Sequence, residues 1–103
     1  MRKIEILHID ECPNWHEAED RVRSVLAELG ASTVAVEPKL LVTRDEAAAV
    51  AFAGSPTILI DGADAFPSEG ATSDLTCRVY FTENGLAGLP SETQLRDVLS
   101  THL

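Results

Sequence analysis

The chain has 103 residues, of which 45% are apolar, enough to bury one compact core but not two. Seventeen acidic residues against eight basic ones give a net charge of −9, which repels phosphate backbones and anionic lipid surfaces. The composition therefore predicts a single domain over residues 1–103 that binds neither nucleic acid nor a membrane.

The apolar runs of the chain are short. The longest, such as 47–53 and 57–60, fall far short of the ~20 residues that span a bilayer. The first nine residues are too short for a signal peptide and include Glu5 and His8, so we expect a cytoplasmic protein. Two cysteines, 65 positions apart, do not form the disulfide framework of a small secreted domain, and free thiols are expected.

The chain begins with a strand and a helix. Residues 3–9 form a continuous β-rich apolar run, typical of a central strand that is covered on both faces. From Pro13 onward apolar residues recur every three or four positions as far as Leu29. Gly30 supplies the left-handed residue that ends such a helix, so a helix is predicted over 13–29.

A second strand and helix follow. Residues 32–41 predict an edge strand, with Pro38 at or beyond its end because proline cannot donate to a sheet ladder. Thr43 and Glu46 then form a capping box ahead of a short helix over 47–53.

The last third of the chain predicts two strands and a helix. Residues 55–62 read as a strand closed by a turn, and residues 77–82 as a strand that pairs antiparallel with it. The intervening residues 63–76 are polar and small, and connections of this length are usually functional or mobile. Ser91 and Gln94 begin the last helix. The order is βαβαββα, which predicts an α/β three-layer sandwich around a four-stranded mixed sheet.

Two motifs in this order resemble a known family. Cys12-Pro13 ends the first strand, and Gly-Ser-Pro-Thr followed by an apolar strand and Asp-Gly opens the third, as in small bacterial thioredoxin-like redox proteins. The resemblance covers nearly the whole chain. It implies a cis peptide bond before Pro56 that faces the active cysteine, and a substrate whose backbone pairs with Ser55, in a site that includes Thr57.

The chain departs from this family at one position. Trp15 stands where the family's dithiol has its second cysteine. A resolving cysteine at that position therefore cannot release a bound substrate, and the expected chemistry is that of a single thiol.

Cys12 is the expected nucleophile. Pro13 suits the first helical position, which makes Cys12 the N-cap, where the helix dipole favours a thiolate. His16 lies one turn further and can add a positive charge or accept the proton, although neighbouring carboxylates oppose a second anion. In the alternative interpretation Cys12 is a small buried residue packed under the third strand.

The remaining aromatic and titratable residues have simpler interpretations. Trp15 either lines a substrate groove with Pro13 or covers the sheet edge. His8 lies inside the first strand and is expected to be structural, and His102 lies at the C-terminus. Two cysteines and three histidines without paired spacing predict no metal site.

Cys77 is the second thiol of the chain. If residues 77–82 run antiparallel to the third strand, Cys77 lies on the order of 15–20 Å from Cys12. A disulfide needs Cα atoms within ~7 Å, so a buried structural thiol is expected. A Cys12–Cys77 bond is the alternative if residues 63–76 move this boundary.

Two functions follow from these residues, and a third possibility is that the acidic exterior and Trp15 serve an oligomer or partner contact without chemistry. The first is thiol–disulfide exchange, in which Cys12 forms a mixed disulfide with a small thiol or a partner protein, and glutathione or another thiol acts as co-substrate without a bound cofactor. The second is a binding module without redox chemistry, for an extended peptide or for a soft metal ion such as mercury on the thiol.

Overall fold

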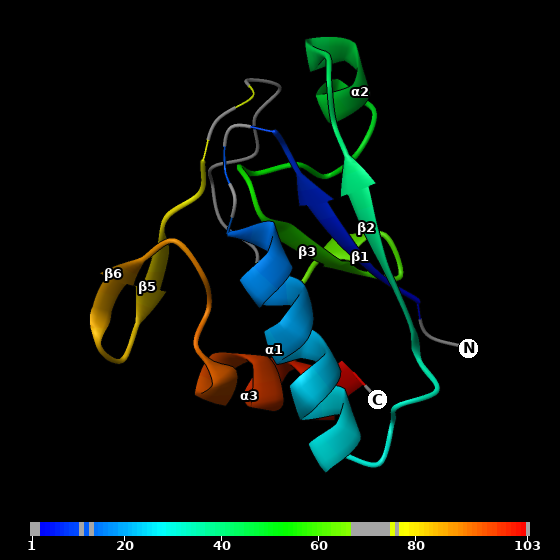
Figure 1. Cartoon of the computed structure of the whole chain (residues 1–103), viewed down its shortest axis with the longest axis vertical. Coiled ribbons are helices and arrows are strands. Elements are labelled where there is room, and N and C mark those ends of the chain that lie inside the picture. Colours follow the sequence, from blue (N-terminus) through cyan, green and yellow to red (C-terminus); the bar gives the residue numbers. More distant parts are fainter. Residues whose placement is uncertain (1–2, 11, 13, 67–74, 76, 103) are drawn as a thin grey trace.

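The computed structural model describes residues 3–10, 12, 14–66, 75 and 77–102 (Figure 1). They form a mixed α/β fold with a four-stranded sheet in the order β2-β1-β3-β4, a separate two-stranded sheet and three helices. This confirms the predicted α/β class and the four-stranded mixed sheet. The elements are β1 (Lys3–His8), α1 (Trp15–Glu28), β2 (Ala35–Leu40), α2 (Arg44–Ala48), β3 (Thr57–Ile60), β4 (Ala63–Asp64), β5 (Tyr80–Thr82), β6 (Gly85–Ala87) and α3 (Glu92–His102).

The sheet is built around β1. It runs parallel to β2 and antiparallel to β3, and β4 extends β3 on the outer side. The parallel pair is joined through α1, and β2 is an edge strand, as the sequence predicts. Pro38 lies inside β2, opposite Ile6, and not at or beyond its end as predicted. An edge strand tolerates this residue because half of its N–H groups have no sheet partner.

The two faces of the sheet bury different side chains. Even-numbered residues of the two central strands, such as Ile4 and Ile58, pack with α1 and α3 in the larger core cluster. Odd-numbered residues such as Leu7 and Leu59 point to the opposite face, because side chains alternate along a strand. There they pack with Cys12 and with residues of α2 and the segment after it, including Phe52.

The helix α1 lies beside α3 on one face of the sheet (Figure 1). Its buried residues Ala18, Val22, Val25 and Leu26 follow the helical period, and Gly30 with φ of +71° ends the helix as predicted. Its first residue is Trp15, two positions after the predicted start.

The predicted capping box before α2 is present. The Thr43 hydroxyl accepts from the Glu46 N–H and the Glu46 carboxylate accepts from the Thr43 N–H. Ser91 and Gln94 make the same reciprocal pair before α3. The helix α2 begins directly after its cap at Arg44 and ends at Ala48, so the predicted span of 47–53 is wrong. The N-cap fixes the first turn, and the residues after Ala48 leave the helix to bury Phe52.

The fourth strand of the sheet is not the predicted one. Asp61 and Gly62, with φ of +52° and +87°, form a tight turn that returns the chain at once to the free edge of β3. This edge is therefore taken by β4, and β5 pairs with β6 in a separate hairpin. Of the segment 63–76, which the sequence predicts to be functional or mobile, residues 67–74 and 76 lie outside the described residues.

Among the residues that the structure describes, no helix is long and apolar enough to cross a membrane.

Candidate functional site

Cys12 and Cys77 are joined by a disulfide bond, with their Cα atoms 6.0 Å apart. The expectation of two free thiols on the order of 15–20 Å apart is therefore wrong. That expectation paired residues 77–82 antiparallel with β3, which puts Cys77 at the end of β3 that is far from Pro56. Instead, Cys77 lies beside Ser55, with which it forms a parallel β-bridge just before β3 begins.

The segment around Ser55 holds the disulfide in place. The Ser55–Pro56 peptide bond is cis, as the family resemblance implies. The Ser55 carbonyl accepts a hydrogen bond from the Arg78 N–H over 2.8 Å, and its hydroxyl accepts from the Ile9 N–H over 3.1 Å. Ser55 thus connects both segments that carry a cysteine.

The Thr57 hydroxyl fixes the backbone just before Ser55. Its hydroxyl accepts from the Ala53 N–H over 3.0 Å and donates to the Gly54 carbonyl. Ser55, Pro56 and Thr57 are all buried. The structure therefore brings these residues to the cysteine pair, but the backbone edge predicted to bind a substrate is occupied by the chain's own residue 78. Their role in binding a substrate stays a prediction.

Arg78 anchors the segment that carries Cys77. Its guanidinium makes two hydrogen bonds to the Asp64 carboxylate, at 3.0 and 3.1 Å, and donates to the Phe66 carbonyl. The Arg78 and Asp64 side chains are only 7% and 13% exposed, which makes this a largely buried ion pair. Breaking such a pair on one side typically costs about 3–5 kcal/mol, because it leaves a charge buried without its partner.

Tyr80 and Gly54 complete this anchor. The Arg78 guanidinium lies 4.5 Å from the centre of the Tyr80 ring, and the Tyr80 hydroxyl donates to the Pro56 carbonyl. Burial raises the pKa of Tyr80, so the phenol keeps the proton that it donates. Gly54 has φ of +105°, and a Cβ there would come within 2.8 Å of the Arg78 Cβ. We call Gly54, Ser55, Asp64, Arg78 and Tyr80 the Arg78 clasp.

Cys12 is less exposed than the sequence suggests. It is 1% exposed and lies among Leu7, Leu59 and Phe52. The N-cap of α1 is Asn14, so the prediction that Cys12 caps the helix is wrong. Pro13, predicted to line the site, lies outside the described residues. The structure thus bears out the buried position of the alternative interpretation, but with the sulfur bonded to Cys77.

Trp15 is stacked between two histidines. Its ring lies 4.0 Å from that of His8 and 3.6 Å from that of His16, centre to centre. Trp15 is half-buried against the larger core cluster, and His16 is exposed. His16 is thus held by the indole ring, and its proposed role as a base for Cys12 stays a prediction.

His8 is the buried member of this stack. Its Nδ1 atom has no hydrogen-bond partner among the described residues. Burial lowers the pKa of His8, the charge of His16 lowers it further, and Asp10 and Glu19 raise it. His8 is therefore a neutral core residue near pH 7, in agreement with the structural role expected from the sequence.

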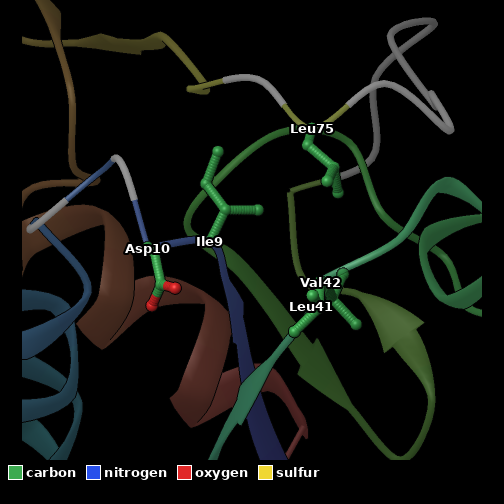
Figure 2. Close-up of a pocket in the computed structure, with 5 residues that line it drawn as sticks. All are labelled: Ile9, Asp10, Leu41, Val42 and Leu75. Atoms are coloured by element: carbon green, nitrogen blue, oxygen red, sulfur yellow. The ribbon is translucent and has the colours of Figure 1, made fainter.

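A small pocket lies at the edge of the apolar cluster that contains Cys12. It has a volume of about 200 Å³ and is lined by Ile9 and Asp10 after β1, Leu41 and Val42 after β2, and Leu75 (Figure 2). Ile9 and Leu75 belong to the same apolar cluster as Cys12. The volume is below the ~300–1,000 Å³ of pockets that enclose a drug-sized ligand. No three potential metal ligands gather within the described part of the chain.

Sequence reasoning missed the Arg78 clasp. The pattern that could have revealed it is the alternation of residues 77–81, in which Arg78 and Tyr80 are buried and Cys77, Val79 and Phe81 are exposed. A charged residue at an inward position predicts a buried partner, here Asp64.

Comparison with known proteins finds no matching family model, curated protein or solved structure.

Proposed function

We propose that this chain is a thioredoxin-like thiol–disulfide exchange protein whose redox pair is Cys12 and Cys77. One observation carries the proposal, namely that the only two cysteines of the chain are bonded to each other and that Cys77 pairs with Ser55. Trp15 stands where the second cysteine of the family would be, and Cys77, 65 positions after Cys12, takes the role of that cysteine. The proposed reaction is therefore the reversible opening and closing of the Cys12–Cys77 disulfide, and not the reaction of a single thiol.

The reaction is a two-electron exchange. Two external thiols reduce the disulfide, give up two protons and two electrons, and form an external disulfide, while both cysteines gain a proton. In the reverse direction the two protein thiols reduce an external disulfide and close the Cys12–Cys77 bond. The co-substrate is a small thiol such as glutathione or the thiol of a partner protein.

The Arg78 clasp argues against a purely structural bond. Residues 78–80 are held by the Arg78–Ser55 and Tyr80–Pro56 hydrogen bonds and the Arg78–Asp64 ion pair, none of which involves sulfur. The segment can therefore stay in place when the bond is reduced. In the cytoplasm predicted from the sequence, disulfides are mostly transient and catalytic or redox-sensing.

The binding of an extended peptide receives less support. The carbonyl of Ser55, which would pair with such a peptide, already accepts from Arg78, and the residue is fully buried. A peptide could pair there only by displacing the Arg78 clasp.

The proposal is tested by the redox equilibrium of the pair. Oxidised protein is equilibrated with mixtures of reduced and oxidised dithiothreitol or glutathione, quenched in acid, alkylated and analysed by mass spectrometry. An exchange protein is expected to be half-reduced between about −200 and −300 mV. A midpoint well below about −300 mV, together with no turnover of 2-hydroxyethyl disulfide by the reduced protein, would indicate a structural bond instead.

Soft-metal binding is a second candidate. After reduction, two sulfur atoms held this close can both bind one thiophilic ion such as mercury, because thiolates prefer soft metals. Native mass spectrometry of the reduced protein with one equivalent of mercuric ion tests this candidate. Binding that survives competition by excess glutathione, and that is lost in Cys77→Ser, supports it, whereas equal binding by Cys77→Ser refutes the two-sulfur site.

A further inference from the structure

The two bonded cysteines lie at different depths. Cys12 is 1% exposed and packed in the apolar cluster with Leu7 and Phe52. Cys77 is exposed, and it shares the outward side of its segment with Val79 and Phe81, whose exposed fractions are 58% and 81%. Within the residues that the structure describes, the side of the bond that an external thiol can approach is therefore that of Cys77.

Cys12 is buried by apolar side chains besides its bond to Cys77. Its apolar neighbours come from β1, β3 and the segment after α2, and they remain when the bond is reduced. The Arg78–Ser55 hydrogen bond and the Arg78–Asp64 ion pair also hold the residue next to Cys77. These contacts do not involve sulfur, so we expect Cys77 to stay near Cys12 when the bond is reduced.

We infer that Cys77 is the sulfur that exchanges with external thiols and disulfides, and that Cys12 is the internal thiol that resolves the mixed disulfide. This inference rests on the proposed exchange function and gives the two cysteines the reverse of the roles that the Cys12-Pro13 motif suggests. It makes Arg78 and Asp64 positioning residues for the reaction.

Each direction of the exchange consists of two displacements at sulfur. In reduction, an external thiolate attacks the Cys77 sulfur, the Cys77–Cys12 bond breaks, and Cys12 leaves as a thiolate that takes up a proton from water. A second external thiolate attacks the external sulfur of the mixed disulfide and releases Cys77 as a thiolate. In oxidation, the Cys77 thiolate attacks an external disulfide and expels one thiolate, and Cys12, having lost its proton to water, then attacks Cys77 and expels the other.

Single-cysteine variants test the order of these steps. Reduced Cys12→Ala and Cys77→Ser are mixed with the neutral probe 4,4′-dithiodipyridine, and release of thiopyridone is followed by absorbance. Cys77, in Cys12→Ala, is expected to react at least tenfold faster than Cys12, in Cys77→Ser. Cys77→Ser reacting as fast as Cys12→Ala, or faster, would overturn the inference.

The wild-type protein gives a second measurement that does not depend on the folding of Cys12→Ala. Oxidised wild type is treated with cysteamine for a short time, quenched in acid and digested, and the adduct is located by mass spectrometry. The inference requires the adduct on Cys77, and an adduct on Cys12 contradicts it while leaving the exchange function intact. If cysteamine in large excess forms no adduct and opens no bond, the exchange function itself is wrong.

Discussion

The N–H of Arg78 donates to the carbonyl of Ser55 over 2.8 Å, and this bond aligns the neighbouring Cys77 with Ser55. Through it the chain places its own backbone on the edge that an extended partner would use in the family it resembles. The cysteine pair is thus assembled from segments that the sequence separates by 65 positions.

The Arg78–Asp64 ion pair is expected to favour closure of the disulfide. In Asp64→Asn the reduced segment is less firmly held, so the effective concentration of Cys77 at Cys12 falls. We expect the equilibrium constant for disulfide closure, measured against dithiothreitol, to decrease about tenfold, which corresponds to ~1.4 kcal/mol. Glu28→Gln is the matched control, because it removes the same charge from an exposed pair with Arg96. Equal closure constants in the two variants would show that the ion pair does not position Cys77.

Reduction of the disulfide is expected to lower the free energy of unfolding by about 4 kcal/mol. This value follows from the chain entropy of closing a loop of 65 residues, provided that the native state is unchanged. Urea denaturation with and without dithiothreitol measures the difference. In Cys77→Ser, which changes an exposed residue, dithiothreitol should have no effect, and a persisting effect would contradict the assignment of the loss to this bond.

Gly54→Ala is expected to destabilise the protein more than Gly62→Ala. Both glycines have positive φ, which costs a residue with a side chain about 1–2 kcal/mol. Only at Gly54 does the added Cβ also meet the Arg78 backbone, at 2.9 Å from its Cα, whereas the space around Gly62 is open. The midpoint of thermal unfolding measures both variants. Equal shifts would show that the approach of Arg78 to Gly54 is not tight in solution.

His8 is expected to make stability depend on pH. Burial holds its pKa below the ordinary value of 6.5 in the folded protein. As pH falls below 6.5 the unfolded chain takes up this proton first, so the free energy of unfolding decreases until pH reaches the folded pKa. Above pH 6.5 the full contribution of neutral His8 is present. Asp10 and Glu19 oppose the shift and His16 adds to it.

The variant His8→Phe tests this dependence, because it preserves an aromatic ring to stack on Trp15 and removes the titrating group. Urea denaturation between pH 5 and 7.5, about the range of histidine titration, should show a smaller loss of stability at low pH than wild type. His102→Asn, at the exposed end of α3, is the control that should resemble wild type. A His8→Phe curve parallel to wild type would assign the pH dependence to other groups.

The acidic surface is expected to select among small thiols. With a net charge of −9, the protein attracts cationic thiols and repels anionic ones at low ionic strength. Reduction of the oxidised protein should therefore be faster with cysteamine than with 2-mercaptoethanol, and slowest with 3-mercaptopropionate, after correction for the thiolate fraction of each reagent. Added salt should bring the three rates together, and an order that salt does not change would exclude long-range charge as its cause.

The sequence predicted the features whose causes are local. Gly30 ends α1, and the Ser91–Gln94 pair begins α3, because a cap involves neighbours within one or two turns. The central position of β1 also followed, because a continuous apolar run is typical of a strand that is covered on both faces.

The cysteine pair could not be predicted in this way. Its formation depends on β4, a strand of two residues that is too short to show a period of its own. By taking the edge of β3, β4 leaves residues 77–78 to pair with Ser55, and Asp64 at its end provides the partner of Arg78. These contacts join residues far apart in the chain, and no local pattern contains them.

The Cys12–Cys77 bond also closes a covalent ring of backbone that includes α1, β2, α2, β3 and β4. A protease that cuts the backbone once between the two cysteines would leave two fragments still attached through sulfur. They would migrate as one band on a denaturing gel without reductant and separate only when a thiol is added.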